Sequence, residues 1–215
     1  HTCDGYQFQS RDQDDVSLEV KLTSDQNQST RWLVGGYIAE IERDVAVSYG
    51  ADLGQGFEHK SYVPATGKNP TDLAFDDSFT TDVLSVFGQY SIDLSNVTEL
   101  SLEGRYDKES RSVDNNVPAR SSALYYGGGA PINPAMTAGG SKIPSRSKSF
   151  DQFQPKISLT TSAENTTVYA SYGVGFRSGG FNSSGSAALI NSQLNIPVAA
   201  GLGVSDTYNK EVSKS

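Results

Sequence analysis

A long alternation of apolar and polar residues, from 150 to 182, constrains the fold more than any other part of the chain. In its first run Phe153, Ile157 and Leu159 fall on one side of an extended backbone, and polar residues fall on the other. After a short polar turn, a second run beginning near residue 167 repeats the pattern. A strict period of two is typical of strands with one apolar and one polar face. The stretch therefore predicts two antiparallel strands joined by a tight turn.

The same alternation recurs along the rest of the chain. The expected strands are residues 16–24, 31–49, 79–94, 99–113, 150–162 and 167–182, and the tail 208–215 begins a seventh. They are joined alternately by short turns, at 25–30, 95–98 and 163–166, and by long loops, at 50–78, 114–149 and 183–206. Short periplasmic turns and longer extracellular loops are typical of outer-membrane barrels. The sequence thus predicts an all-β, antiparallel up-and-down transmembrane β-barrel segment with long extracellular loops.

Six complete strands and the start of a seventh are too few to close such a barrel. The smallest transmembrane barrels have about eight strands. An open sheet in lipid leaves its edge groups unpaired, and each unpaired group costs several kcal/mol. Since the chain begins at His1 and ends within an apparent strand, we expect residues 1–215 to be a fragment of one barrel domain. The single cysteine, Cys3, is then a loop thiol or half of a bridge to a residue further upstream.

One face of each strand is expected to meet lipid. The apolar residues assigned to it are Leu84, Val86, Ile92, Leu100, Leu102, Ile157, Leu159, Val168 and Val174. The aromatic residues expected on outward faces are Tyr37, Tyr49, Tyr90, Tyr106, Tyr172 and Phe176, where interfacial belts form. In the second strand the apolar residues from Leu33 to Val47 are assigned outward with Tyr37. Arg43 interrupts that face, so we expect it to lie above the bilayer.

Charged residues on the opposite face are candidates for a functional lumen wall. They are Glu103, Arg105, Asp107, Lys156 and Arg177. Each contacts a plug domain or a passing substrate, or belongs to a hydrated wall whose neighbouring charge pairs are worth little.

Three aromatic residues of the long loops are candidates for ligand contact. They are Phe57, Tyr125 and Tyr126. Exposed loop aromatics often bind ligands, and packing within the loop is the alternative. We expect the long loops to grip the solute together with other parts of the protein.

Several functional classes find little support. A formal net charge of −8 without a basic stripe argues against nucleic acid as a partner. Only His1 and His59 are present, and neither has a second histidine at ligand spacing, so no metal site, cofactor or catalytic group is expected. Gly173, Gly175 and Gly179 loosely match a nucleotide-binding loop, but no helical pattern follows them. The chain is therefore expected not to be an enzyme.

The wording of several segments resembles the barrel strands of TonB-dependent outer-membrane receptors. The segments are PKISL with TVYASYGVGFRSGGFN near the end, and before them, in order, EVKLTS, RWLVGGY, VFGQYSID and LSLEGRYD, with YNKEVSKS as the start of the next strand. The resemblance implies a barrel of about 22 strands. It also implies import of a scarce solute such as a ferric siderophore, energised through TonB. The plug domain and TonB box of the family are absent from these residues. Implied partners are outer-membrane lipid, the rest of the barrel with its plug, TonB, and the extracellular solute.

Two other classes of protein remain open. One is an outer-membrane barrel that does not transport, such as an adhesin. The other is a soluble all-β binding module, in which the outward aromatic residues would form a core. Packing of the apolar faces against a second sheet would favour the soluble module.

Overall fold

The chain folds into one antiparallel sheet of seven strands in sequence order. The computed structural model describes residues 5–56, 58–119, 133–136, 139–194 and 203–215. The strands of the sheet are β1 (Gly5–Thr23), β2 (Thr30–Ala51), β3 (Asp72–Ser95), β4 (Thr98–Asn115), β5 (Arg146–Ala163), β6 (Thr166–Arg177) and β9 (Glu211–Lys214). Every neighbouring pair is antiparallel. The predicted up-and-down order, with six long strands and the start of a seventh, is confirmed.

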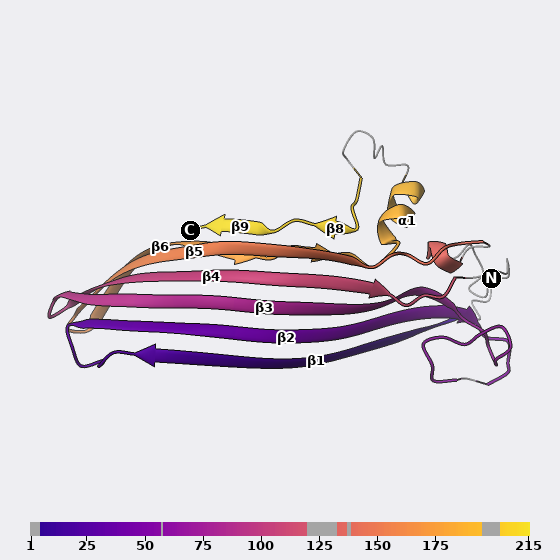
Figure 1. Cartoon of the computed structure of the whole chain (residues 1–215), viewed down its shortest axis with the longest axis horizontal. Helices are drawn as coiled ribbons and strands as arrows, with labels where there is room; N and C mark the ends of the chain where they lie inside the picture. The colour runs from indigo at the N-terminus through magenta and orange to yellow at the C-terminus, as the bar shows by residue number, and fades with distance from the viewer. Residues whose placement is uncertain (1–4, 57, 120–132, 137–138, 195–202) are drawn as a thin grey trace.

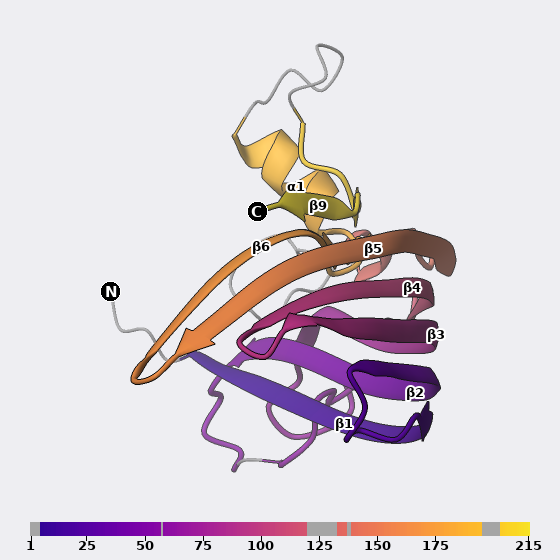
Figure 2. The same ribbon diagram turned by 90° about the vertical axis from the view of Figure 1, so that its left-hand side faces the viewer.

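The connections differ at the two ends of the sheet. The three tight turns lie together at one end, and the long loops lie at the other (Figure 1). The third long loop carries a small hairpin of β7 (Gly180–Phe181) and β8 (Thr207–Tyr208), and the helix α1 (Ser186–Gln193); the second carries the short 3-10 helix η1 (Pro134–Met136). The sheet is curved and open, with β1 and β9 as its edges (Figure 2).

Three strand boundaries differ from the predicted ones by five residues or more, and β5 also begins earlier than predicted, at Arg146. β1 begins at Gly5 rather than residue 16, because residues 5–15 pair with 41–51 of β2 although they lack an apolar alternation. β3 likewise begins at Asp72, which shortens the first long loop. β6 ends at Arg177, before two glycines that lead the chain away from the sheet. Backbone pairing extended these strands where side-chain patterning gave no signal.

The cross-strand register sorts the side chains onto two faces. Residues Val20, Gly36, Val86, Tyr106 and Phe153 share one row. We call the face of this row the outer face and the opposite one the inner face. Of the nine residues expected to meet lipid, all lie on the outer face; Ile92, Leu100 and Val174 are half-exposed and the other six are exposed, for example Leu102 at 44% and Val168 at 65%. No second sheet covers this face in the described part of the chain.

The second strand is the exception, because its predicted orientation is wrong. The register places Trp32, Val34 and Ile38 on the outer face, opposite Tyr90, Gly88 and Leu84. The apolar residues from Leu33 to Val47 were expected outward but lie on the inner face. Tyr37 and Arg43 lie there with them, as does Tyr49 beyond that range. β2 has apolar residues on both faces, so the pattern of this strand alone does not identify its outer side. Only the neighbouring strands fix it.

The outer face changes character along the strands. In the half nearer the turns, here called the turn half, its residues are mainly apolar: Val16 to Leu22 on β1, Trp32 to Ile38 on β2, Leu84 to Leu94 on β3, Leu100 to Tyr106 on β4 and Phe153 to Leu159 on β5. In the other half, here called the loop half, the same face carries carboxylates: Asp12, Asp14, Glu40, Glu42, Asp44, Asp82 and Asp114. The apolar surface is thus a band, not a whole face.

Buried apolar side chains gather at the loop end. Leu73, Val117, Ala135 and Met136 pack together, with Tyr62 against them. This cluster joins the first and second long loops to the beginning of β3, at Leu73. It fixes loop segments and lies away from the apolar band.

Candidate binding surface on the inner face

A charged cluster occupies the inner face of the turn half, with Asp107 at its centre. The Asp107 carboxylate accepts hydrogen bonds from Arg105 Nε at 2.7 and 2.9 Å, and from Ser85 and Gln154. Arg105 also donates through Nη2 to Ser85 Oγ at 2.8 Å. These four residues come from β3, β4 and β5, whose register brings them side by side. The side chain of Asp107 is only 10% exposed, so its charge is neutralised within the wall.

Aromatic rings and a second ion pair flank this cluster. The guanidinium carbon of Arg105 lies 5.7 Å from the centre of the Phe87 ring and 6.0 Å from that of Tyr37. On the next inner-face row, Lys156 Nζ lies 3.0 Å from Glu103 Oε1. A shallow pocket of about 400 Å³ lies over these residues. Its charges are paired with one another, as expected for a hydrated wall.

The structure brings together four of the residues predicted as lumen-facing. Glu103, Arg105, Asp107 and Lys156 form one patch on the inner face. Arg177 lies on the same face but apart from them, exposed and opposite Glu211 in the register of β6 and β9. The predicted ligand contacts Phe57, Tyr125 and Tyr126 lie outside the described residues, as does Cys3. Their roles stay predictions.

In the loop half, the third long loop is fastened to the sheet. The fully buried Asp77 of β3 accepts a hydrogen bond from the backbone N–H of Ser184 at 2.9 Å and another from Asn115 Nδ2 at 3.0 Å. Arg146 of β5 donates to Ser184 Oγ at 3.1 Å and lies 3.5 Å from the Asp206 carboxylate. These contacts hold residues 182–184 and 206 at the loop end of the sheet.

Two adjacent glycines let this segment approach closely. A Cβ at Gly179 would lie 2.5 Å from the Phe150 ring and 2.4 Å from the Tyr208 carbonyl oxygen. At Gly180 it would lie 2.6 Å from the Tyr208 hydroxyl and 3.3 Å from Arg111 Nη1. Real Cβ atoms do not lie this close to a backbone oxygen, so glycine is required at residue 179 for this packing. At residue 180 an added Cβ would instead displace the ends of the Tyr208 and Arg111 side chains. The hairpin of β7 and β8 consequently lies against the inner face.

A pocket of about 180 Å³ forms between the hairpin and the inner face. The side chains that define it are Gln13, Arg43, Phe79, Arg111, Phe181 and Tyr208. The Arg43 guanidinium lies 4.6 Å from the centre of the Phe79 ring. Arg111 pairs with Glu109 at 2.7 Å, and Ser178 donates to the same Glu109 oxygen at 2.6 Å. Two guanidinium groups and three aromatic rings therefore meet at one place.

Sequence reasoning missed this pocket because its residues come from six strands far apart in the chain. β1, β2, β3 and β4 each contribute, and the hairpin contributes from beyond β6. The one available signal was Arg43, which interrupts an otherwise apolar run. The prediction attributed that interruption to height above the bilayer, whereas the residue points to the inner face.

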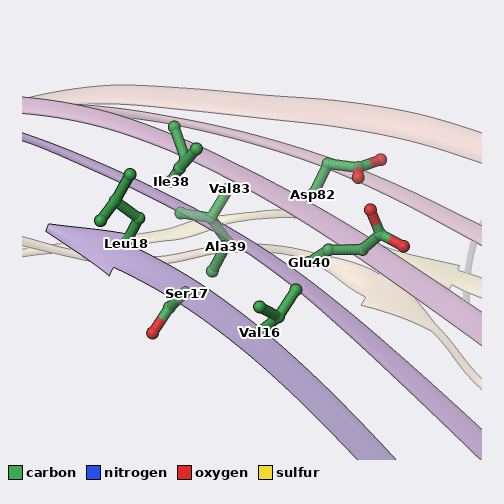
Figure 3. Close-up of a pocket in the computed structure, with 8 residues that line it drawn as sticks. All are labelled: Val16, Ser17, Leu18, Ile38, Ala39, Glu40, Asp82 and Val83. Atoms are coloured by element: carbon green, nitrogen blue, oxygen red, sulfur yellow. The ribbon is translucent and has the colours of Figure 1, made fainter.

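A larger depression of about 340 Å³ lies on the outer face, where the apolar band meets the carboxylates (Figure 3). Leu18 and Ile38 stand at one end of it, and Glu40 and Asp82 at the other, while the Ser17 hydroxyl points away. Its lining combines the two surfaces without a convergent set of polar groups. It marks the boundary between the turn half and the loop half.

A metal site and a membrane-spanning helix are two further features that a chain can carry. Within the described ranges, no group of three or more His, Cys, Asp or Glu side chains is placed to hold a metal ion. The described helices are also too short or too polar to cross a membrane.

The sequence was also compared with known proteins. A family model described as "TonB dependent receptor-like, beta-barrel" matches residues 4–211. The comparison with curated proteins gave no match. The family match covers nearly the whole chain, and an antiparallel up-and-down sheet with short turns at one end is the architecture that such a barrel requires. The chain belongs to the TonB-dependent receptor β-barrel family.

Proposed function

We propose that this chain forms part of the wall and the extracellular loops of an outer-membrane receptor that imports a scarce solute, such as a ferric siderophore. The observation that carries the proposal is the apolar band. Six of the nine outer-face residues expected to meet lipid are exposed, and no second sheet lies against them in the part of the chain that the structure describes. Exposed apolar surface on this scale is unfavourable in water. Hydrocarbon would cover it, which supports a position of the turn half within the outer membrane.

The inner face would then line the lumen. Its ion pairs, Arg105 with Asp107 and Lys156 with Glu103, suit a hydrated wall or a plug surface. The turns would face the periplasm and the long loops the outside. The plug domain and the TonB box would be supplied by other parts of the protein, and the energy by TonB. No catalytic role is proposed for any residue.

Uptake in living cells tests this function. Cells that carry the intact receptor should accumulate one ⁵⁵Fe-siderophore of a chemically diverse panel, and cells lacking TonB should not. Accumulation that is independent of both TonB and the receptor across the whole panel would overturn the proposal. An adhesin-like barrel would insert in the membrane and give that result.

A second experiment tests the proposed role of the loops. Deletion of residues 124–140 removes Tyr125 and Tyr126, which we propose as ligand contacts. We expect loss of solute binding in a receptor that still shows heat-modifiable migration on gels, as a folded barrel does. Unchanged affinity in the folded deletion variant would remove this loop from the binding site.

A further inference from the structure

The pocket beneath the β7–β8 hairpin contains a cation, Arg43, that no carboxylate of the described residues neutralises through an ion pair. Arg43 forms no ion pair with any residue that the structure describes, and its cross-strand neighbours are Gln13 and Phe79. The second guanidinium, Arg111, is balanced by Glu109. Of the two guanidinium groups, that of Arg43 is therefore the one without an ion-pair partner among the described residues. Arg43 is exposed, so a ligand can reach it.

The rest of the lining is aromatic. Phe79, Phe181 and Tyr208 surround the guanidinium groups, and the Tyr208 side chain is 44% exposed. Rings and guanidinium planes both stack on flat groups. A volume of about 180 Å³ is below the roughly 300 Å³ at which pockets for whole drug-sized ligands begin. The pocket is therefore suited to one planar ring with its substituents.

Both basic and acidic side chains lie on the inner face at this height. The basic ones are Arg43, Arg111, Arg146 and Lys148, and the acidic ones are Asp15, Asp77 and Glu109. Arg111 is paired with Glu109, and Arg146 lies near Asp206. Arg43 is therefore the guanidinium through which the pocket can meet an anion, whereas the outer face presents carboxylates such as Glu42 and Asp44 at the same height.

We propose that this pocket binds a small planar anion, namely an aromatic ring bearing a carboxylate, free or as one group of a larger solute. Arg43 contacts the carboxylate, and Tyr208 and Phe181 stack on the ring. Gly180 keeps the space between Tyr208 and Arg111 open, since a Cβ there would lie within 2.6 Å of the tyrosine hydroxyl. The proposal rests on the proposed function in taking the inner face as the lumen, and it adds the chemical class of a ligand.

The test uses ¹⁹F NMR on the intact receptor in detergent micelles, with 4-fluorobenzoate as probe and the neutral 4-fluorobenzamide as its matched control. Empty micelles correct for partition of the ring into detergent. We expect saturable binding of the benzoate, about tenfold tighter than that of the amide, because a charge-assisted hydrogen bond distinguishes them. Equal affinities, or signals no larger than those of empty micelles, would overturn the proposal.

Three variants locate the site. Arg43→Gln should weaken benzoate binding about tenfold and leave amide binding unchanged. Gly180→Ala should weaken both, because the added methyl group displaces Tyr208. Lys108→Gln removes one positive charge from the outer face of the same sheet and should change neither. An equal loss in Lys108→Gln and Arg43→Gln would reduce the effect to overall charge and contradict a built site.

The outcomes separate this inference from the proposed function. Benzoate binding without TonB-dependent uptake of any solute would retain the pocket and reject the transport role. Uptake without benzoate binding would retain the transport role and reject the pocket.

Discussion

The turn half and the loop half of the sheet are built from the same strands but have opposite surface chemistry. In the turn half the outer face is apolar, and the inner charges at Asp107 and Lys156 are paired. In the loop half the outer face is acidic, and the inner face carries Arg43 without an ion-pair partner among the described residues. Backbone pairing extends across both halves, with one register shift between Val47 and Ser48 in the loop half. We propose that the difference reflects what surrounds each half, with hydrocarbon against one outer face and water against the other.

The largest expected effect tests whether the outer faces of the two halves meet different surroundings. Leu102→Arg places a charge in the apolar band and should cost about 2–4 kcal/mol if the residue lies near the bilayer midplane. Glu42→Arg places the same side chain on the outer face of the loop half and should change stability by less than about 0.5 kcal/mol. The measurement is urea unfolding of the receptor in lipid vesicles. Equal losses at the two sites would show that both halves meet the same solvent.

The next effect concerns the inner face. Asp107→Ala leaves Arg105, Ser85 and Gln154 without their shared acceptor and should cost about 2 kcal/mol. The value is moderate because the Arg105 side chain is 40% exposed and water can replace the lost partner. Arg43→Ala in the loop half should cost at most about 1 kcal/mol, the value of its contact with Phe79.

A double-mutant cycle sharpens this second comparison. If Arg105 and Asp107 act as a pair, the double alanine variant should lose less stability than the sum of the two single variants. Simple additivity would mean that the cluster contributes through separate contacts. The charged residues on the inner face of the turn half would then act independently of one another, as Arg43 does in the loop half.

A smaller, local effect is expected where the third long loop joins the sheet. Asp77→Ala removes the acceptor of the Ser184 N–H, so the segment 182–194 should exchange its amide hydrogens about tenfold faster. Exchange in the turn half, for example at Leu102, should not change. Hydrogen exchange resolved by mass spectrometry measures both. Faster exchange throughout β3 would mean that Asp77 stabilises the strand and not the loop.

The sequence predicted the strands well because strands with one apolar and one polar face have a regular alternation of side chains. The strands β3 to β6 have this alternation. The prediction failed for the orientation of β2, where Trp32 and Leu33 make both faces apolar at the turn end. The predicted β1 was also too short. Residues such as Asp12 and Asp14 pair with β2 through their backbone, and their exposed polar side chains give no apolar alternation. The inner-face pocket was not predictable, because its residues come from six strands that only the sheet register and the hairpin bring together.

The smallest expected effect concerns the pKa values of two carboxylates, one at each end of the sheet. In the first turn, Asp25 accepts hydrogen bonds from the Asn27 backbone N–H at 2.9 Å and from the Gln28 and Asn27 side chains. These bonds favour the ionised form and hold the pKa of Asp25 below its ordinary 3.8. In the first long loop, Glu58 has its pKa lowered from 4.5, chiefly by its contact with Lys60 at 3.1 Å.

A depressed pKa adds local stability above the ordinary value, and that stability is lost as the pH falls through the lower value of the folded state. Both segments should therefore loosen only in acid, the loop below about pH 4.5 and the turn below about pH 3.8. Salt separates the causes. At about 1 M salt the charge pair is screened, so the pKa of Glu58 should return toward 4.5, whereas that of Asp25, held by neutral donors, should stay low. NMR titration of the two carboxyl carbons measures both values, and an equal response to salt would show that the turn is held by net charge and not by its hydrogen bonds.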